Sequence, residues 1–112
     1  MTTALQRTVL VLGPGAIEPA QLYPDDIDGS MTLVVIAAGW PLTAAQQQAI
    51  EVARRLAREQ GIVFDAMLVG SLEEGLETVS ARDRVLLGTD RRETRRVNRV
   101  LRTRRLSARV AR

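Results

Sequence analysis

The stretch VLLGTDRRETRRVNRVLRTRR, residues 85–105, contains one complete unit of the fold that the sequence predicts. A short apolar run ends at Gly88, and Asp90 and Glu93 then follow with the spacing of a capping box, in which each side chain bonds the other residue's backbone at a helix start. The stretch therefore predicts a strand, a tight corner and a capped helix. Three apolar residues at helical spacing give this helix its inner side: Val97, Val100 and Leu101.

Apolar runs of strand length occur four times in the chain, at residues 8–12, 32–37, 62–69 and 84–87. Each run is continuous and rich in Val, Ile and Leu, rather than alternating between apolar and polar residues. Continuous runs of this kind are typical of parallel strands that are buried on both faces. We therefore expect helices to cover both faces of the sheet.

Two further helices are expected after the second and third runs. Residues 43–60 begin with Thr43 and Gln46 at capping-box spacing, carry alanine and leucine at helical spacing, and stop at Gly61. Ser71 and Glu74 repeat the box spacing ahead of a shorter helix. Strand, corner and capped helix thus recur three times after residue 31, and this alternation indicates a mainly parallel sheet.

The connection over residues 13–31 lacks this pattern. It holds three prolines and an acidic turn, so we expect a loop with at most one helical turn, beginning at Pro19. The predicted fold class is α/β: a single small three-layer Rossmann-like domain over residues 1–104, with a mainly parallel four-stranded sheet and flanking helices. Residues 105–112 are expected to form a basic, frayed C-terminal tail.

Charge is unevenly distributed along the 112 residues, whose net charge is +3. Residues 1–90 hold six arginines and twelve acidic residues, a net charge of −6, whereas residues 91–112 hold ten arginines and one glutamate, a net charge of +9. The body of the domain is therefore acidic and its end is strongly basic.

The residue types that carry most enzyme chemistry are missing. The chain has no Cys, His or Lys, which removes thiolate nucleophiles, imidazole bases and metal ligands, and Walker-type phosphate loops. The acidic turn with Asp25, Asp26 and Asp28 lacks the alternation and the distant glutamate of a calcium loop. We therefore expect a protein that is not an enzyme, with no catalytic residue, no metal site and no cofactor.

The N-terminal stretch MTTALQRTVLVLGPGA has too few continuous apolar residues for the core of a signal peptide. Elsewhere no run approaches the ~18 apolar residues of a membrane span. We therefore expect a cytoplasmic protein that does not associate with a membrane.

The stretches DRVLLGTDRR (residues 83–92) and TAAQQQAIEVARRLAREQGIVFDAMLV (residues 43–69) resemble the universal stress protein family. In that family an aspartate opens the penultimate strand, and a glycine turn leads to the basic start of a helix. Members that bind ATP also carry a spaced glycine motif, but here, counting from Gly88, the second glycine position is Arg91 and the final Gly-Ser or Gly-Thr pair is Leu101-Arg102. The resemblance therefore implies a Rossmann-like member without the ATP-binding signature.

Two corners are candidates for ligand binding. Gly13-Pro14-Gly15 follows the first strand, but residues 18 and 19 are Glu and Pro where a dinucleotide fingerprint needs a small residue and a helix, so a plain turn is favoured. The corner after the last strand could hold a phosphate or carboxylate on the amide groups of the helix start, where the capping aspartate would compete for the same amides. The residues of this candidate anion site are Gly88, Thr89, Asp90, Arg91 and Arg92.

The arginine-rich segment has three interpretations. In the first, it is a solvated surface helix. In the second, it docks on an acidic surface, which belongs to this chain, to a second copy or to an acidic protein partner. In the third, it binds nucleic acid through phosphate contacts. Tyr23, Trp40 and Phe64 are the only aromatic residues and lie far from this segment in the sequence, which disfavours a dedicated single-strand binder. The nucleic-acid interpretation rests on Arg91, Arg92, Arg95, Arg96, Arg99, Arg102, Arg104 and Arg105.

The preferred functional hypothesis is a small non-catalytic regulatory or assembly domain that resembles universal stress proteins. We expect a homodimer, because the short sheet has edges that need cover and because body and tail carry opposite charge. The alternative hypothesis is a nucleic-acid-associated protein that binds through its arginine-rich C-terminal segment.

Overall fold

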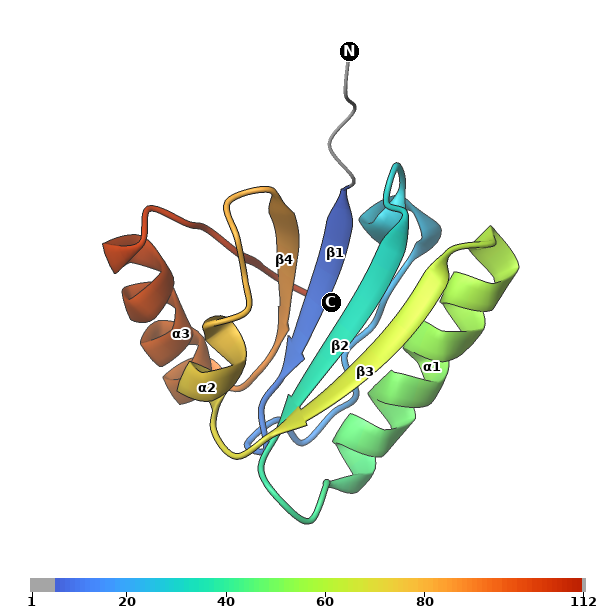
Figure 1. Ribbon diagram of the computed structural model, residues 1–112. Coiled ribbons are helices and arrows are strands. Elements are labelled where there is room, and N and C mark those ends of the chain that lie inside the picture. The colour runs from blue at the N-terminus through green and yellow to red at the C-terminus, as the bar shows by residue number, and fades with distance from the viewer. Residues whose placement is uncertain (1–5, 112) are drawn as a thin grey trace.

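The computed structural model of the protein describes residues 6–111, which form one parallel sheet in the strand order β3-β2-β1-β4-β5 (Figure 1). The strands span Arg7–Leu12 (β1), Thr32–Ala38 (β2), Val63–Val69 (β3), Asp83–Gly88 (β4) and Arg109–Val110 (β5). The helices span Ala44–Gln60 (α1), Leu72–Leu76 (α2) and Arg91–Thr103 (α3), with a 3-10 turn at Pro24–Ile27 (η1). The predicted α/β class with a parallel sheet is confirmed.

Helices cover both faces of the sheet, so the domain has three layers (Figure 1). Leu10 and Leu12 of β1 face a core that includes α1, whereas Val9 and Val11 of the same strand face a second core with α2 and α3. All four side chains are at most 2% exposed. This burial on both sides explains why the strand reads as a continuous apolar run. None of the helices formed by residues 6–111 is long and apolar enough to cross a membrane.

Local sequence signals account for the helix ends. Thr43 and Gln46 form the predicted box at the start of α1, and Gly61 ends this helix in a left-handed conformation at φ +69°. At the start of α2, Ser71 accepts a hydrogen bond from the Glu74 amide, but the Glu74 carboxylate accepts from the Gly70 amide instead of completing a box with Ser71.

The connection between β1 and β2 contains η1 in place of an α-helix. The sequence predicts at most one helical turn in this loop, beginning at Pro19, whereas in the structure the turn begins at Pro24. Pro24 occupies the first position of the turn, and the Asp26 carboxylate accepts a hydrogen bond from the Tyr23 amide at 2.7 Å. The side-chain bond of Asp26 fixes where the turn begins, and this bond outweighs the preference of Pro19 for a helix start.

The four-stranded sheet predicted from the sequence is wrong in one respect, because the structure has a fifth strand. Arg105 adopts a left-handed conformation at φ 58°, and the chain reverses after α3 toward the edge of β4. β5 pairs with β4 through Leu86↔Arg109 and Leu87↔Val110, and the Ala111 amide donates to the Leu87 carbonyl at 2.8 Å. Residues 109–110, which the sequence assigned to a frayed tail, therefore belong to the sheet.

The strand order creates one switch point. From β1 the chain adds β2 and β3 on one side, and it later adds β4 and β5 on the other side of β1. Ligands of open parallel sheets gather at the carboxyl ends of the strands where the order reverses. In this protein that position lies between the ends of β1 and β4.

Candidate functional site

The switch point coincides with the corner that the sequence singled out. The Gly88 carbonyl at the end of β4 accepts a hydrogen bond from the Gly13 amide at 3.0 Å, which joins the corner to the end of β1. The hydroxyls of Thr89 and Thr94 are 2.7 Å apart. The structure brings together all the residues of the predicted anion site, at the end of β4 and the start of α3: Gly88, Thr89, Asp90, Arg91 and Arg92.

The carboxylates of Asp90 and Glu93 occupy amide groups at this corner. Asp90 Oδ1 accepts a hydrogen bond from the Glu93 amide at 2.7 Å, and Glu93 Oε1 accepts from the Asp90 amide at 3.0 Å. Glu93 Oε2 also accepts from the Gly15 amide at 2.8 Å, and the Glu93 residue is only 6% exposed. Because a phosphate would bring further negative charge beside two carboxylates, the geometry disfavours an anion at this corner.

The loop after β1 approaches the same two carboxylates closely. A Cβ atom at Gly13 would lie 2.4 Å from Glu93 Oε1, and one at Gly15 would lie 2.1 Å from Asp90 Oδ2. Glycine at both positions is therefore explained by this close approach. The sequence indicated a plain turn here, and its contact with Glu93 could not be predicted because the two segments are 78 residues apart.

A second side chain ties the carboxyl ends of β1 and β2. Gln46 of α1 is 2% exposed, and its Nε2 donates to the Leu12 carbonyl at 3.2 Å and to the Ala38 carbonyl at 2.8 Å. A hollow of ≈370 Å³ remains beside Gly88, but its lining includes the acidic Glu18. The carboxyl edge of the sheet is therefore held mainly by the protein's own polar groups.

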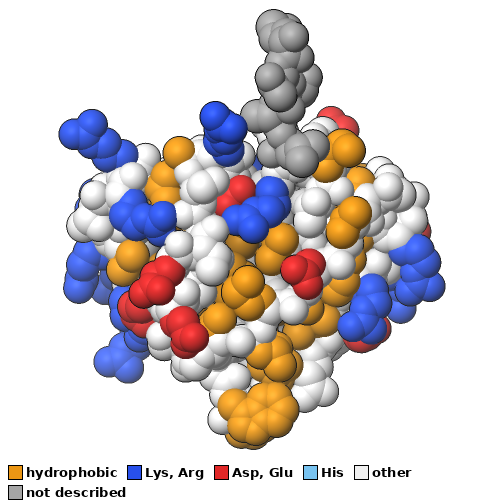
Figure 2. Space-filling model, viewed as in Figure 1, with side chains coloured by type: hydrophobic (Ala, Val, Ile, Leu, Met, Phe, Trp, Pro, Cys, Tyr) orange, Lys and Arg blue, Asp and Glu red, His pale blue; other side chains and the backbone are white. Residues whose placement is uncertain are grey.

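The exposed side of α3 carries the largest concentration of positive charge. Figure 2 shows basic side chains gathered on the side of the molecule where Figure 1 places α3. Val97 and Leu101 are fully buried against the sheet, which turns the arginines of the helix outward. Within residues 6–111, six of the eight arginines named by the nucleic-acid interpretation are exposed and make no ion pair or side-chain hydrogen bond. We call these six the α3 arginine surface: Arg91, Arg92, Arg95, Arg99, Arg102 and Arg105.

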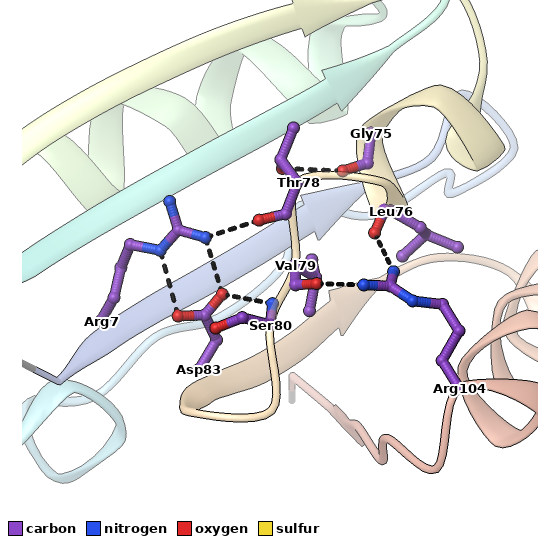
Figure 3. Close-up of polar contacts among 8 residues, drawn as sticks. All are labelled: Arg7, Gly75, Leu76, Thr78, Val79, Ser80, Asp83 and Arg104. Carbon is purple, nitrogen blue, oxygen red and sulfur yellow. Dashed lines mark hydrogen bonds and ion pairs between the residues drawn. The ribbon is translucent and has the colours of Figure 1, made fainter.

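The other two arginines of that prediction have partners inside the protein. Arg96 Nε lies 2.7 Å from Glu73 Oε1 at the start of α2. Arg104 donates from its two terminal nitrogens to the carbonyls of Leu76 and Val79, each at 2.5 Å (Figure 3). Arg104 thus fastens the end of α2 to α3, and its guanidinium is committed to the fold.

A shallow groove crosses the N-terminal half of α3. Its volume is ≈660 Å³, and its lining combines four arginines with the two capping acids: Asp90, Arg92, Glu93, Arg95, Arg96 and Arg99. The helix rises about 1.5 Å per residue, so these arginines are spaced along roughly 10 Å of helix axis. Arg96 is already paired with Glu73, and the two capping acids disfavour an anion at the corner itself. Arg92, Arg95 and Arg99 make no ion pair within residues 6–111, and their spacing along the helix suits successive phosphates of a polyanion rather than one enclosed small molecule.

A separate cluster fixes the chain between α2 and β4 (Figure 3). Arg7 donates two hydrogen bonds to the Asp83 carboxylate, from Nε to Oδ1 at 3.1 Å and from Nη2 to Oδ2 at 2.7 Å. Its Nη2 also donates to the Thr78 carbonyl at 2.8 Å. Burial alone would raise the pKa of Asp83, but the hydrogen bonds from Arg7 and from the Ser80 amide outweigh it and hold that pKa below its usual value. The hydrogen bond to Asp83 in turn raises the pKa of Arg7 above its usual value.

The acidic turn after residue 24 has a structural role. The Asp26 carboxylate accepts from the Tyr23 amide and pairs with Arg109 of β5 at 2.6 Å. Arg84 donates to the carbonyls of Asp26 and Asp28 at 2.7 and 2.9 Å. Among residues 6–111 no group of three side chains is placed to bind a metal ion.

Comparisons with family models, with curated proteins and with solved structures find no match to this chain. The resemblance to universal stress proteins therefore stays a prediction from the sequence.

Proposed function

We propose that the protein is a non-catalytic domain that binds the phosphate backbone of nucleic acid through the α3 arginine surface. One observation carries this proposal: six exposed arginines lie on the 13-residue helix α3 or directly after it, and none of them is paired within residues 6–111. The rest of the domain carries a net negative charge.

Electrostatic repulsion on α3 supports the need for an anionic partner. Residues three or four apart on a helix face each other at about 5–6 Å, and like charges at these spacings destabilise a helix by roughly 0.2–0.5 kcal/mol per pair. Arg95, for example, lies three or four residues from each of Arg91, Arg92 and Arg99. A polyanion would relieve this repulsion, and it would also release the counterions condensed on its own phosphates.

The same features argue for binding without base recognition. Arginine pairs with phosphate in a forked geometry, whereas sequence-tolerant stacking on single strands needs aromatic side chains. Tyr23, Trp40 and Phe64 all lie outside α3. We therefore expect duplex and single strands of any sequence to bind, with phosphate contacts supplying the affinity.

The experiment is a binding titration with duplex and single-stranded oligonucleotides at several salt concentrations. If the six arginines each meet a phosphate, the affinity for duplex should fall roughly 10³-fold between about 50 and 200 mM salt. The triple variant Arg92→Gln, Arg95→Gln, Arg99→Gln should weaken binding roughly 10²-fold at about 0.1 M salt and reduce the logarithmic salt slope by about 3.

A matched control removes equal charge from other faces of the domain, by Arg55→Gln, Arg58→Gln and Arg82→Gln, all at exposed positions. This control should retain most of the affinity. Equal losses in the two triple variants would show that only net charge matters, and they would overturn the assignment to α3. Stronger binding to polyglutamate of the same charge than to either oligonucleotide would overturn it in favour of an acidic protein partner.

A second candidate is a regulatory or assembly domain that works through protein contacts. The carboxyl edge of the sheet supports a domain without a nucleotide site, because Gln46, Asp90 and Glu93 hold strand ends and amides that a nucleotide would otherwise contact. A thermal-shift screen with nucleotides tests whether this edge is closed to them. We expect no stabilisation, and a saturable shift that depends on Asp90 or Arg91 would contradict it.

A further inference from the structure

The outer edge of β3 presents a row of backbone groups to solvent. β3 is the last strand on its side of the sheet, and it pairs only with β2. The Val63 amide donates to the Met31 carbonyl at 3.1 Å, and the Val69 carbonyl accepts from the Gly39 amide at 3.0 Å. Because successive residues of a strand direct their backbone groups to opposite sides, the groups of Phe64, Ala66 and Leu68 point away from the sheet.

This edge lacks the devices that usually prevent strand pairing. Free edges are commonly shortened, bulged, interrupted by proline or marked with lysine. β3 instead runs for seven residues in unbroken register with β2, and its sequence VFDAMLV contains one charge, Asp65. The other edge of the sheet is β5, which is two residues long.

Exposed apolar side chains lie at both ends of the same edge. Val63 and Leu68 of β3 are 63% and 56% exposed, Met31 before β2 is 57% exposed, and Trp40 after β2 is 79% exposed. Figure 2 shows hydrophobic side chains in a band that runs down the side of the molecule where Figure 1 places β3, as far as the lower tip. Met31 and Val63 mark the amino end of the edge, and Leu68 and Trp40 mark its carboxyl end.

We propose that β3 pairs with β3 of a second copy of this chain, antiparallel, about a two-fold axis at Ala66. In this register Ala66 meets Ala66 of the second copy, and Phe64 meets Leu68, so that all three outward positions exchange paired hydrogen bonds. The antiparallel arrangement also sets the carboxyl apolar end of one copy against the amino apolar end of the other. The edge is therefore complementary to itself, which is what a two-fold interface requires.

One feature of this register opposes association and gives a specific test. Asp65 lies opposite Met67 of the second copy, so the two Asp65 side chains become diagonal neighbours about 7–8 Å apart. Like charges at this separation repel, and salt screens them. Asp65→Asn should therefore tighten the dimer severalfold at low salt, and it should have a smaller effect at high salt.

The decisive variant is Ala66→Pro. The Ala66 amide points away from β2, so proline removes a donor of the free edge and leaves the β2–β3 ladder intact. Ala66→Ser keeps that amide and serves as the matched control. Leu68→Arg is a second variant at an exposed position, where it places a charge in the interface without changing the backbone.

The experiment is sedimentation velocity on the full chain, without nucleic acid, from about 1 to about 300 μM, because interfaces of modest size give dissociation constants in the micromolar range. We expect a reversible dimer for the wild type and for Ala66→Ser, and monomers for Ala66→Pro and Leu68→Arg with an unchanged circular dichroism spectrum. A wild type that stays monomeric throughout, or a dimer that survives both variants, overturns the proposal. Because α3 takes no part in this assay, its outcome is independent of nucleic-acid binding.

Discussion

Glu93 performs two tasks at the start of α3. Its backbone amide is capped by Asp90, and its own carboxylate accepts hydrogen bonds from the amides of Asp90 and Gly15. The residue joins a helix start to a loop from the opposite end of the sequence. A carboxylate in this position replaces the bound anion that other proteins hold at such a corner.

Replacing Glu93 should destabilise the domain strongly. Glu93→Ala leaves two amide donors without their acceptor in a largely buried corner, and we expect a loss of about 2–4 kcal/mol in the free energy of unfolding. Glu93→Gln keeps one acceptor oxygen and should lose less. Urea denaturation measures both, with Glu59→Ala at the exposed end of α1 as the control. Equal stability of Glu93→Ala and the control would show that the corner does not need the carboxylate.

Asp83 should make stability depend on pH. Its pKa is lower in the folded state than in the unfolded state, so its contribution is fully present above the unfolded pKa, about 3.9, and is lost as the pH falls through the folded pKa. Asp83→Asn should cost about 1–3 kcal/mol at pH 7, because Arg7 loses its anionic partner. The difference from the wild type should shrink toward pH 2 in urea denaturation. Asp25→Asn, at an exposed position, is the control for the loss of one negative charge at pH 7.

At the scale of the element, repulsion between neighbouring arginines on the outer side of α3 destabilises the helix. Asp90 and Glu93 complete a capping box at its start, and Val97 and Leu101 anchor it to the sheet. Its outer side gathers like charge, so packing and capping must offset the repulsion. The helix is therefore stable because of its ends and its inner face.

Removing one arginine from this surface should stabilise the domain. Arg95→Gln relieves three like-charge spacings, so we expect a gain of a few tenths to about 1 kcal/mol at low salt. The gain should fade near ~1 M salt, where charges are screened within about 3 Å. Arg54→Gln on α1 provides the contrast, because Arg54 pairs with Glu51 at 2.9 Å and lies over the Phe64 ring. Thermal unfolding compares the two, and a loss of stability for Arg95→Gln would contradict the repulsion argument.

Elements with strong local signals could be predicted from the sequence. The four apolar runs became β1 to β4, and the boxes at Thr43 and Asp90 begin α1 and α3. β5 could not be predicted, because Arg109 and Val110 are both exposed and become a strand only through pairing with β4. In the same way, the role of Arg104 depends on carbonyls 25 and 28 residues away. The candidate corner was found from its local pattern, whereas its occupation by Glu93 required the fold.

For the whole molecule, β5 closes one side of the sheet through two kinds of contact. Its backbone pairs with β4, and the Arg109 side chain reaches Asp26 in the loop after β1. The two contacts join the end of the described chain to β4 and to the loop between β1 and β2.

Comparing a truncation before residue 107 with Arg109→Gln should separate the contribution of the β4–β5 pairing to stability from that of the Arg109–Asp26 ion pair. Loss of β5 exposes the edge of β4, and we expect a cost of about 1–3 kcal/mol in the free energy of unfolding. Arg109→Gln removes only the ion pair, whose arginine side chain is 66% exposed, and should cost less than 1 kcal/mol. Thermal denaturation of the two variants measures the difference. An Arg109→Gln variant as unstable as the truncation would place the stability in the ion pair.

The central position of β1 has a consequence for how fast the protein folds. β1 pairs with β2 about 25 residues later in the chain, but its pairing with β4 joins Arg7 to Asp83 across 76 residues. Closing the longer loop costs more chain entropy, so we expect β1, β2 and α1 to form first and the pairing of β1 with β4 to follow. Destabilising substitutions in β1 or β2 should then mainly slow refolding, whereas those at Asp83 or in α3 should mainly accelerate unfolding in stopped-flow experiments.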